Sequence, residues 1–305
     1  MGRIGGLIEE LRKQAAAAAT SPFRHAPYPL AHSLEYRGDP GLFGPDSVSW
    51  RVIGDPASFI GGIRALLIQA AHPEVVAGVE DHSRYREDPL GRLSRTSAYV
   101  TATTYGAMPE VEKAIAQVRR VHRVVSGVSS RGIPYDADDP GYSAWVHNAL
   151  TDSFLVANQI FGADRLTPEE ADRFVIEQTR VGELLDADPM PVTAECLTSW
   201  IEAHDEPATS PEMRDPVAFL VDPPLDDDLK LGYKLIMEAA VATIPIRLRD
   251  ILELTKAPGA ITAGKAVAAG LRWALGASPS WQLALIRVGA PVPAGRFKQP
   301  LPVPV

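Results

Sequence analysis

The sequence has a single cysteine, Cys196. One thiol excludes a disulfide framework, a cysteine-based zinc site and a four-thiolate iron–sulfur cluster. Leu197 and Trp200 flank this cysteine at helical spacing, which predicts a thiol packed in the core. So low a cysteine content fits a reducing compartment.

The 305-residue chain also lacks an excess of basic charge, with 30 Lys and Arg against 38 Asp and Glu and a net charge of −8. This balance argues against a general nucleic-acid binder, whose affinity rests on neutralising phosphates. Hydrophobic residues at 46% and charged residues at 22% are typical of a globular protein.

Long hydrophobic runs are missing as well. The longest apolar stretches, residues 57–71 and 235–246, are too short to span a bilayer and contain Arg64 and Glu238 respectively. Four charged residues interrupt positions 9–13, where a signal peptide needs an unbroken apolar region. We therefore expect no transmembrane segment and a cytoplasmic protein.

Helix start signals recur along the chain, whereas alternating runs with hairpin signals are nearly absent. An N-cap acceptor precedes a proline at Asp55-Pro56, Asp88-Pro89, Asp139-Pro140, Thr167-Pro168 and Asp215-Pro216. Thr167 with Glu170 also forms a capping-box pattern. The predicted fold is all-α.

The chain divides into three predicted parts. Residues 1–35 form an N-terminal arm with a short amphipathic helix, and residues 291–305 form a proline-rich tail. No long linker separates two cores in between, so residues 36–290 are predicted to be a single multi-helix domain.

Several common functional motifs are incomplete or absent in this sequence. Gly259 to Lys265 matches most of a phosphate-binding loop, but Ala266 replaces the Ser or Thr that would hold magnesium. None of the seven histidines has a Glu three residues earlier, as bundled di-iron sites require. His72-Pro-Glu74 and His204-Asp-Glu206 offer the H-x-E spacing of a non-haem iron triad, a pattern short enough to arise by chance.

One predicted helix places a histidine on an apolar face. Within residues 109–126 the aliphatic positions Val111, Ile115, Val118 and Val125 share that face with His122. A buried imidazole needs partners for its nitrogens, and either a backbone carbonyl or a metal ion meets this need. His122 is therefore a candidate metal ligand or a structural core histidine.

The helix predicted after Asp139-Pro140 repeats this arrangement. His147 shares a face with Leu150, Thr151, Phe154 and Asn158, so we expect it to point inward too. Two neighbouring helices that each bury a histidine favour a shared site without establishing one.

A third predicted helix, residues 88–105, has a polar stripe. Arg92, Thr96, Tyr99 and Thr103 lie on one face, with Arg95 beside them. Arginine suits a bidentate carboxylate, so the stripe indicates a pocket for an anionic group beside a metal. The alternative is a solvated face or salt bridges to neighbouring acids such as Asp88.

The combination of these residues resembles that of a known protein family. The chain resembles the catalytic domain shared by MpaB-type oxygenases and latex clearing proteins (rubber oxygenases) over about residues 36–290. The motifs that carry the resemblance are Asp39 to Asp46, Ala71-His72-Pro73, Asp81-His82-Ser83, Asp88 to Thr96, Val121 to Val124, Tyr135 to Pro140 and Trp145-Val146-His147. Their shared order makes the match more specific than any single motif.

The resemblance implies an all-α fold that encloses one b-type haem, on which latex clearing proteins use dioxygen to cleave isoprenoid double bonds. It implies that His122 is the proximal ligand and that Arg92 and Thr96 belong to the Arg-x-x-Lys-Thr haem-pocket motif. Arg95 stands where the latex clearing proteins have lysine, and an arginine cannot lose its proton to ligate iron. His147, in the Trp-Val-His pattern of smaller actinobacterial-type relatives, is the opposite axial ligand, a distal hydrogen-bond donor or the proximal ligand itself.

The sequence therefore predicts a haem-dependent oxygenase that acts with dioxygen on a hydrophobic, unsaturated small molecule. In this prediction Arg92 binds a haem propionate or dioxygen, Thr96 donates a hydrogen bond nearby, and His147 or Arg95 tunes the distal side. Three alternatives stay open: a non-catalytic haem or lipophile carrier or sensor, a haem peroxidase, and a cofactor-free helical protein with structural histidines. The sequence does not define the oligomeric state.

Overall fold

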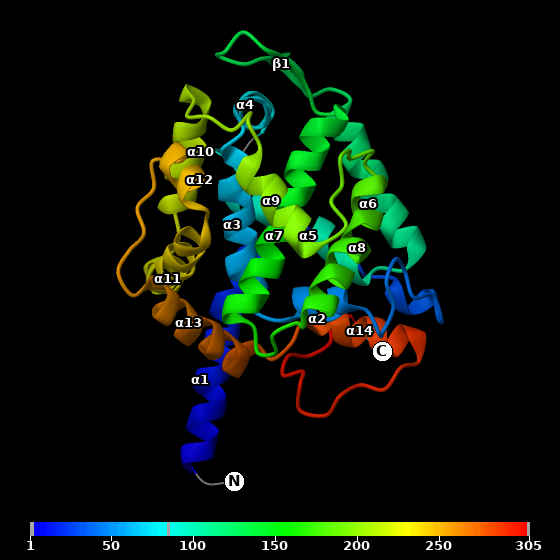
Figure 1. Ribbon diagram of the computed structural model, residues 1–305. Coiled ribbons are helices and arrows are strands. Elements are labelled where there is room, and N and C mark those ends of the chain that lie inside the picture. Colours follow the sequence, from blue (N-terminus) through cyan, green and yellow to red (C-terminus); the bar gives the residue numbers. More distant parts are fainter. Residues whose placement is uncertain (1–2, 84–85, 304–305) are drawn as a thin grey trace.

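The computed structural model describes residues 3–83 and 86–303 of the chain (Figure 1). The first helices in chain order are α1 Arg3–Thr20, α2 Val48–Gly54, α3 Ser58–Ala70, α4 Pro73–His82, α5 Pro89–Tyr105, α6 Met108–His122 and α7 Pro140–Phe161. They are followed by α8 Pro168–Glu183, α9 Ala194–Ala203, α10 Pro211–Val221, α11 Asp227–Thr243, α12 Ile246–Ile251, α13 Ala260–Leu275 and α14 Pro279–Val288. Two 3₁₀ turns, Ser21–Phe23 and Ser33–Glu35, lie between α1 and α2.

The all-α prediction is confirmed for the described residues, with one small exception. Strands β1 (Ser126–Val128) and β2 (Pro134–Asp136) form an antiparallel hairpin between α6 and α7, in which Gly127 pairs with Tyr135. Among the described residues no helix is long and apolar enough to cross a membrane.

Side-chain caps explain several of the helix starts. Asp88 accepts a hydrogen bond from the Gly91 amide at 3.0 Å, and Asp139 accepts one from the Gly141 amide at 2.8 Å. Thr167 completes a capping box with Glu170 at the start of α8. These three starts confirm the prediction, because each acceptor satisfies an amide that has no partner within the helix.

Two of the predicted starts differ. Pro216 lies inside α10, which begins at Pro211 after the N-cap Ser210. Asp55 ends α2, and α3 begins at Ser58, two residues after Pro56. In both cases a local Asp-Pro signal is present, and neighbouring residues decide where the helix starts.

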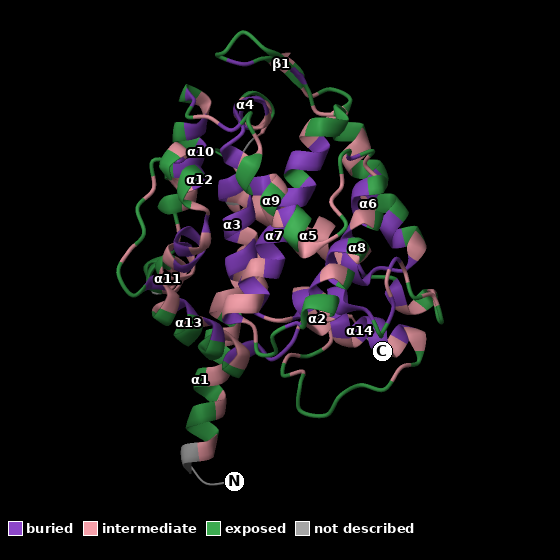
Figure 2. Ribbon diagram, viewed as in Figure 1, coloured by how far each residue is buried: buried purple, intermediate pink, exposed green. Residues whose placement is uncertain are grey.

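The core is built around the packing of α3 against α7. Leu67 and Ile68 of α3 and Trp145 and Ala149 of α7 are fully buried in one large apolar cluster. Gly61 permits the close approach, because a Cβ there would lie 2.9 Å from the Phe154 ring. Figure 2 shows that both helices are largely buried at the centre of the molecule.

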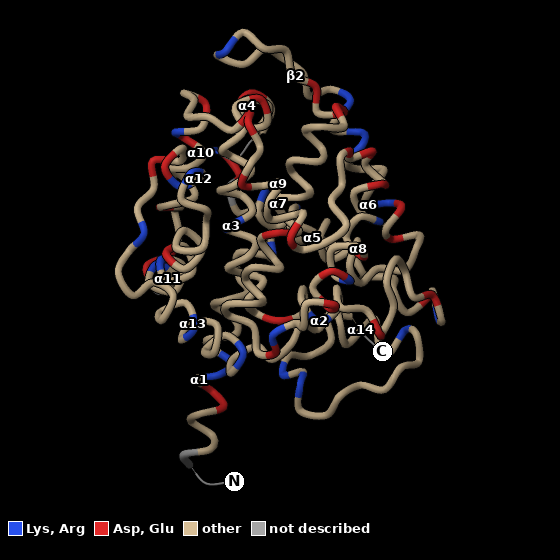
Figure 3. Tube along the Cα trace, viewed as in Figure 1, with Lys and Arg blue, Asp and Glu red and all other residues tan. Residues whose placement is uncertain are grey.

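The other helices surround this pair. α10, α11, α12 and α13 lie on one side, and α6 and α8 lie on the other (Figure 1). Acidic and basic residues alternate around the outside of the helical body (Figure 3).

The two terminal segments pack on the body. α1 contacts α13. The segment after α14 contains a turn at residues 294–296, and Phe297 packs edge-on against Trp281 at 5.6 Å between ring centroids. The proposed boundaries at residues 35 and 290 stay a prediction.

Cys196 is exposed, so the prediction of a packed core thiol is wrong. The inward face of α9 is defined by Leu197 and Ile201, which are four residues apart and fully buried. Cys196 lies one position away from this face, and the helix therefore turns its thiol towards solvent.

Candidate functional site

The polar stripe of α5 begins at the surface. Arg95 is exposed and its Nη1 lies 2.9 Å from Asp88 Oδ2, which is the salt bridge that the sequence offered as an alternative. The hydrogen bond from Arg95 holds the pKa of Asp88 below its ordinary value. Thr96 is exposed, and its hydroxyl donates to the Arg92 carbonyl at 3.1 Å.

Arg92 differs from Arg95 in its surroundings. Its guanidinium is half-buried and donates from Nη1 to the hydroxyl of Ser83, the residue that follows α4. Arg92 is thus held against a neighbouring helix, whereas Arg95 is paired along its own.

Further along the same face the stripe enters the protein. Tyr99 packs on the apolar cluster formed by Leu42, Val111, Ile115 and Val181, and burial raises the pKa of its phenol. Thr103 is buried and donates to the Tyr99 carbonyl at 3.0 Å. Helix α5 therefore runs from the surface at Arg95 into the interior beside α6 and α8.

His122 is the last residue of α6, and its side chain is 30% exposed. The expectation of a core position is wrong at this end of the helix: Val111 and Ile115 are buried, but the final turn extends beyond its packing partners. Its Nδ1 lies 3.9 Å from a carboxylate oxygen of Asp138. Desolvation lowers the pKa of His122, and Asp138 opposes this effect.

The other ring nitrogen of His122 is open. Within residues 3–83 and 86–303 no protein group donates a hydrogen bond to its Nε2 or accepts one from it. Val121 and Val124, which are close to His122 in sequence, are also exposed. A neutral imidazole nitrogen with an available lone pair can coordinate a metal ion.

His147 points inward as predicted, and its surroundings are different. It is buried on α7, where its Nε2 lies 2.8 Å from the Gln178 carbonyl of α8 and therefore carries the proton. Burial lowers the pKa of His147 to about 4, so the ring is neutral at pH 7. The satisfied Nε2 matches the structural role that the sequence left open for a core histidine.

His72 and His204, which belong to two separate H-x-E motifs of the sequence, lie close together in the structure. His72, at the junction of α3 and α4, lies 3.0 Å from Glu206 through its Nε2 and Glu206 Oε2. His204, at the end of α9, lies 3.2 Å from the same oxygen. The H-x-E spacing was the only signal for this cluster, and no local pattern could indicate that the two motifs meet.

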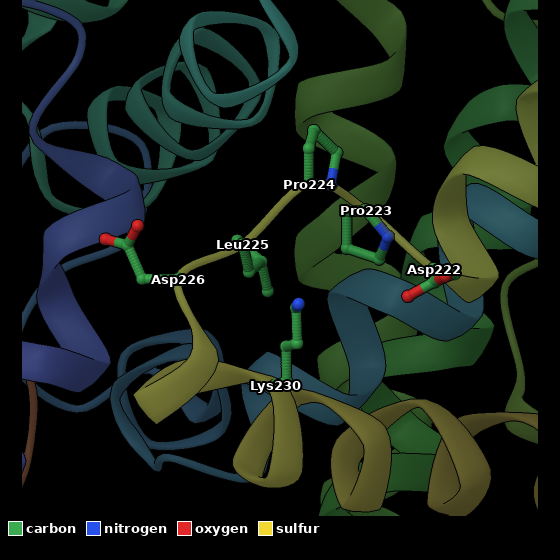
Figure 4. Close-up of a pocket in the computed structure, with 6 residues that line it drawn as sticks. All are labelled: Asp222, Pro223, Pro224, Leu225, Asp226 and Lys230. Atoms are coloured by element: carbon green, nitrogen blue, oxygen red, sulfur yellow. The ribbon is translucent and has the colours of Figure 1, made fainter.

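Two surface recesses lie away from these residues. Asp222 to Asp226 and Lys230 line one of about 500 Å³, in which Leu225 and Lys230 are directed towards one another (Figure 4). The second, of about 210 Å³, lies between α2, α13 and the C-terminal segment and includes Arg272 and Trp281. Neither recess is lined by residues of the α5 stripe or by the histidines. The candidate site is therefore identified from the chemistry of its side chains and not from the volume of a cavity.

Comparison with protein families gives a match over residues 50–275 to the catalytic domain described as ER-bound oxygenase mpaB/B'/rubber oxygenase. The chain belongs to this family. Searches of curated proteins and of solved structures return no significant match.

Membership of the MpaB/rubber oxygenase family supports an oxygenase in general, which acts with dioxygen on a small molecule. The matched range contains all the candidates on α5, α6 and α7: Arg92, Arg95, Thr96, His122 and His147. Arg95 and Thr96 are exposed, whereas Arg92 and His122 are partly buried and His147 is buried. Of these two histidines, His122 is the one whose Nε2 has no hydrogen-bond partner among the described residues.

Proposed function

We propose that this protein is a haem b-dependent oxygenase that uses dioxygen to oxidise a hydrophobic, unsaturated small molecule of the isoprenoid class. The observation that carries the proposal is the state of His122: an Nε2 without a partner among the described residues and a carboxylate oxygen of Asp138 3.9 Å from Nδ1. Haem ligation requires a neutral imidazole whose free nitrogen faces the iron while an acceptor orients the other.

The residues of the chain have distinct tasks in this proposal. His122 holds the iron, and Asp138 favours the tautomer that carries its proton on Nδ1. Arg92, steadied by Ser83, pairs with a propionate of the cofactor. The haem iron supplies the binding and activation of dioxygen.

With Arg95 in place of lysine, this position would offer no ligand to the iron. Its guanidinium is paired with Asp88 and has no lone pair to offer a metal. Because histidine ligation lacks the electron push of a thiolate, we favour addition of dioxygen to the substrate over hydroxylation. The overall reaction then adds both oxygen atoms to a carbon–carbon double bond, which breaks and leaves two carbonyl groups.

Haem binding is tested by the visible spectrum of the purified protein after haem supply, with a pyridine haemochrome assay. We expect a Soret band in the wild type, its loss in His122→Ala and its retention in His147→Ala. His32→Ala is the control, because His32 is exposed and paired with Glu35. A wild type without a Soret band, or loss confined to His147→Ala, contradicts the assignment.

The reaction is tested by dioxygen uptake with squalene and, as a matched control, with saturated squalane. We expect uptake with squalene alone and none in His122→Ala. Turnover that depends on hydrogen peroxide identifies a peroxidase. Haem binding without carbon monoxide binding to the ferrous form identifies a carrier or sensor.

A further inference from the structure

Three potential metal-ligating atoms converge at the corner between α3 and α4, outside the α5–α6–α7 set. They are Nε2 of His72, Nε2 of His204 and Oε2 of Glu206. The possible ligand atoms of these three residues all lie within 4.8 Å of one another. Both imidazoles approach the same carboxylate oxygen, at 3.0 and 3.2 Å.

Without a bound cation, the neutral ring of His72 leaves one of its nitrogens without a suitable hydrogen-bond partner. His72 is fully buried, and its Nδ1 has no hydrogen-bond partner, although Glu74 Oε2 lies 3.5 Å away. If Nε2 carries the proton and donates to Glu206, the lone pair of Nδ1 faces the carboxylate of Glu74. A buried polar atom left in this state destabilises the fold.

A metal ion at Nε2 removes this conflict. The proton then resides on Nδ1 and faces Glu74, which gives the carboxylate–histidine–metal arrangement common around protein metal ions. Glu74 is itself fixed, since Ser129 donates to it at 2.7 Å and Arg131 donates through Nε at 3.1 Å. The orienting carboxylate is thus already in position.

The second histidine is also held in place. The His204 ring stacks on Trp145 with 5.0 Å between centroids and contacts Trp200 at 4.5 Å. The loop that carries Glu206 is joined to the α3–α4 corner by the hydrogen bond from the Ala208 amide to the Ala71 carbonyl at 3.1 Å. Glu206 is 51% exposed, so an ion can enter from solvent.

We propose that His72, His204 and Glu206 bind a divalent metal ion such as Zn²⁺ or Fe²⁺. Two imidazole nitrogens and one carboxylate oxygen suit Zn²⁺ or Fe²⁺ better than Mg²⁺ or Ca²⁺, which prefer oxygen ligands. Three protein ligands leave room for water or another small ligand. The ion links the α9–α10 loop to the start of α4, and none of its ligands belongs to the proposed haem site.

The test uses untagged protein, treated with chelator, dialysed and titrated with Co²⁺, whose visible absorption reports its coordination. Zn²⁺ then competes for the site, and elemental analysis gives the stoichiometry. We expect one ion per chain and at least a roughly 10-fold loss of affinity in His204→Ala and in Glu206→Gln, since each removes a ligand. Zn²⁺ also raises the melting temperature of the wild type.

His32→Ala is the matched control. His32 Nδ1 lies 2.9 Å from Glu35 Oε1, so this exposed histidine–carboxylate pair resembles half of the proposed site. The control keeps wild-type affinity. Failure to bind a stoichiometric ion, or equal affinity in wild type and Glu206→Gln, overturns the proposal.

Glu206→Gln changes a half-exposed side chain, so it decides the question even if His204→Ala fails to fold. The outcome is separable from the haem proposal. His122→Ala retains the Co²⁺ spectrum, and Glu206→Gln retains the Soret band.

Discussion

At the scale of single residues, the two candidate histidines differ in what their ring nitrogens contact. His147 is enclosed, and its Nε2 is used by the Gln178 carbonyl. His122 is partly exposed and keeps its Nε2 available. The helical period places both on apolar faces, so sequence alone could not rank them by these contacts.

The depressed pKa of His147 leads to a prediction about stability and pH. Burial moves the pKa from 6.5 to about 4, so the unfolded chain takes up the proton first as the pH falls. The stabilisation is complete above about pH 6.5 and is lost as the pH falls towards 4, at a total of about 3 kcal/mol. Urea unfolding from pH 7 to 4.5 should show a shallower decline for His147→Gln.

His32→Ala serves as the reference for this experiment because His32 is exposed. Its unfolding free energy should follow the wild-type pH profile. An identical slope in wild type and His147→Gln contradicts a neutral, buried His147.

At the scale of elements, α3 and α7 approach each other through Gly61. A Cβ at this position would lie 2.9 Å from Phe154 Cδ1 and 3.1 Å from the Ser153 carbonyl oxygen. The adjacent Gly62 has open space, with nothing within 4 Å. The close approach of α7 therefore requires glycine at position 61 but not at position 62.

Gly61→Ala should destabilise the protein by about 1–3 kcal/mol because the backbone of α7 must move. Gly62→Ala should stabilise it by up to about 1 kcal/mol, since alanine favours the helix. Chemical denaturation of both variants gives the comparison. Equal effects would show that the helices do not meet as closely as described.

At the scale of the whole molecule, one buried ion pair joins four helices. Arg64 Nη1 of α3 lies 2.7 Å from Asp152 Oδ2 of α7, and both side chains are about 2% exposed. Thr198 of α9 donates to Asp152 at 3.3 Å, and Arg64 donates to the Thr243 carbonyl at the end of α11. This network fixes the relative positions of the helices around the core.

Asp152→Asn should reduce the free energy of unfolding by roughly 3–5 kcal/mol, because it leaves the arginine charge buried without its partner. Asp186→Asn is the matched control: Asp186 lies 2.7 Å from Arg119, but both side chains are exposed. Its loss should cost less than about 1 kcal/mol. Similar losses in the two variants would contradict the role of the buried network.

The sequence by itself determined the local features of this protein. The helices around Asp88, Asp139 and Thr167 could be predicted because each cap bonds amides within its own first turn. The ambiguous Asp215-Pro216 signal failed, because a competing start at Ser210 lay five residues earlier. Membership of the oxygenase family was likewise readable from ordered motifs, and residues 50–275 confirm it.

Only the tertiary structure decided which side chains meet and how far each is buried. Periodicity shows the face on which His122 lies, but the extent of its packing partners decides whether that turn is covered. His72 and His204 come together because the α9–α10 loop folds back onto the α3–α4 corner. Such contacts join distant parts of the chain, and their free energy depends on the packed arrangement rather than on any local pattern.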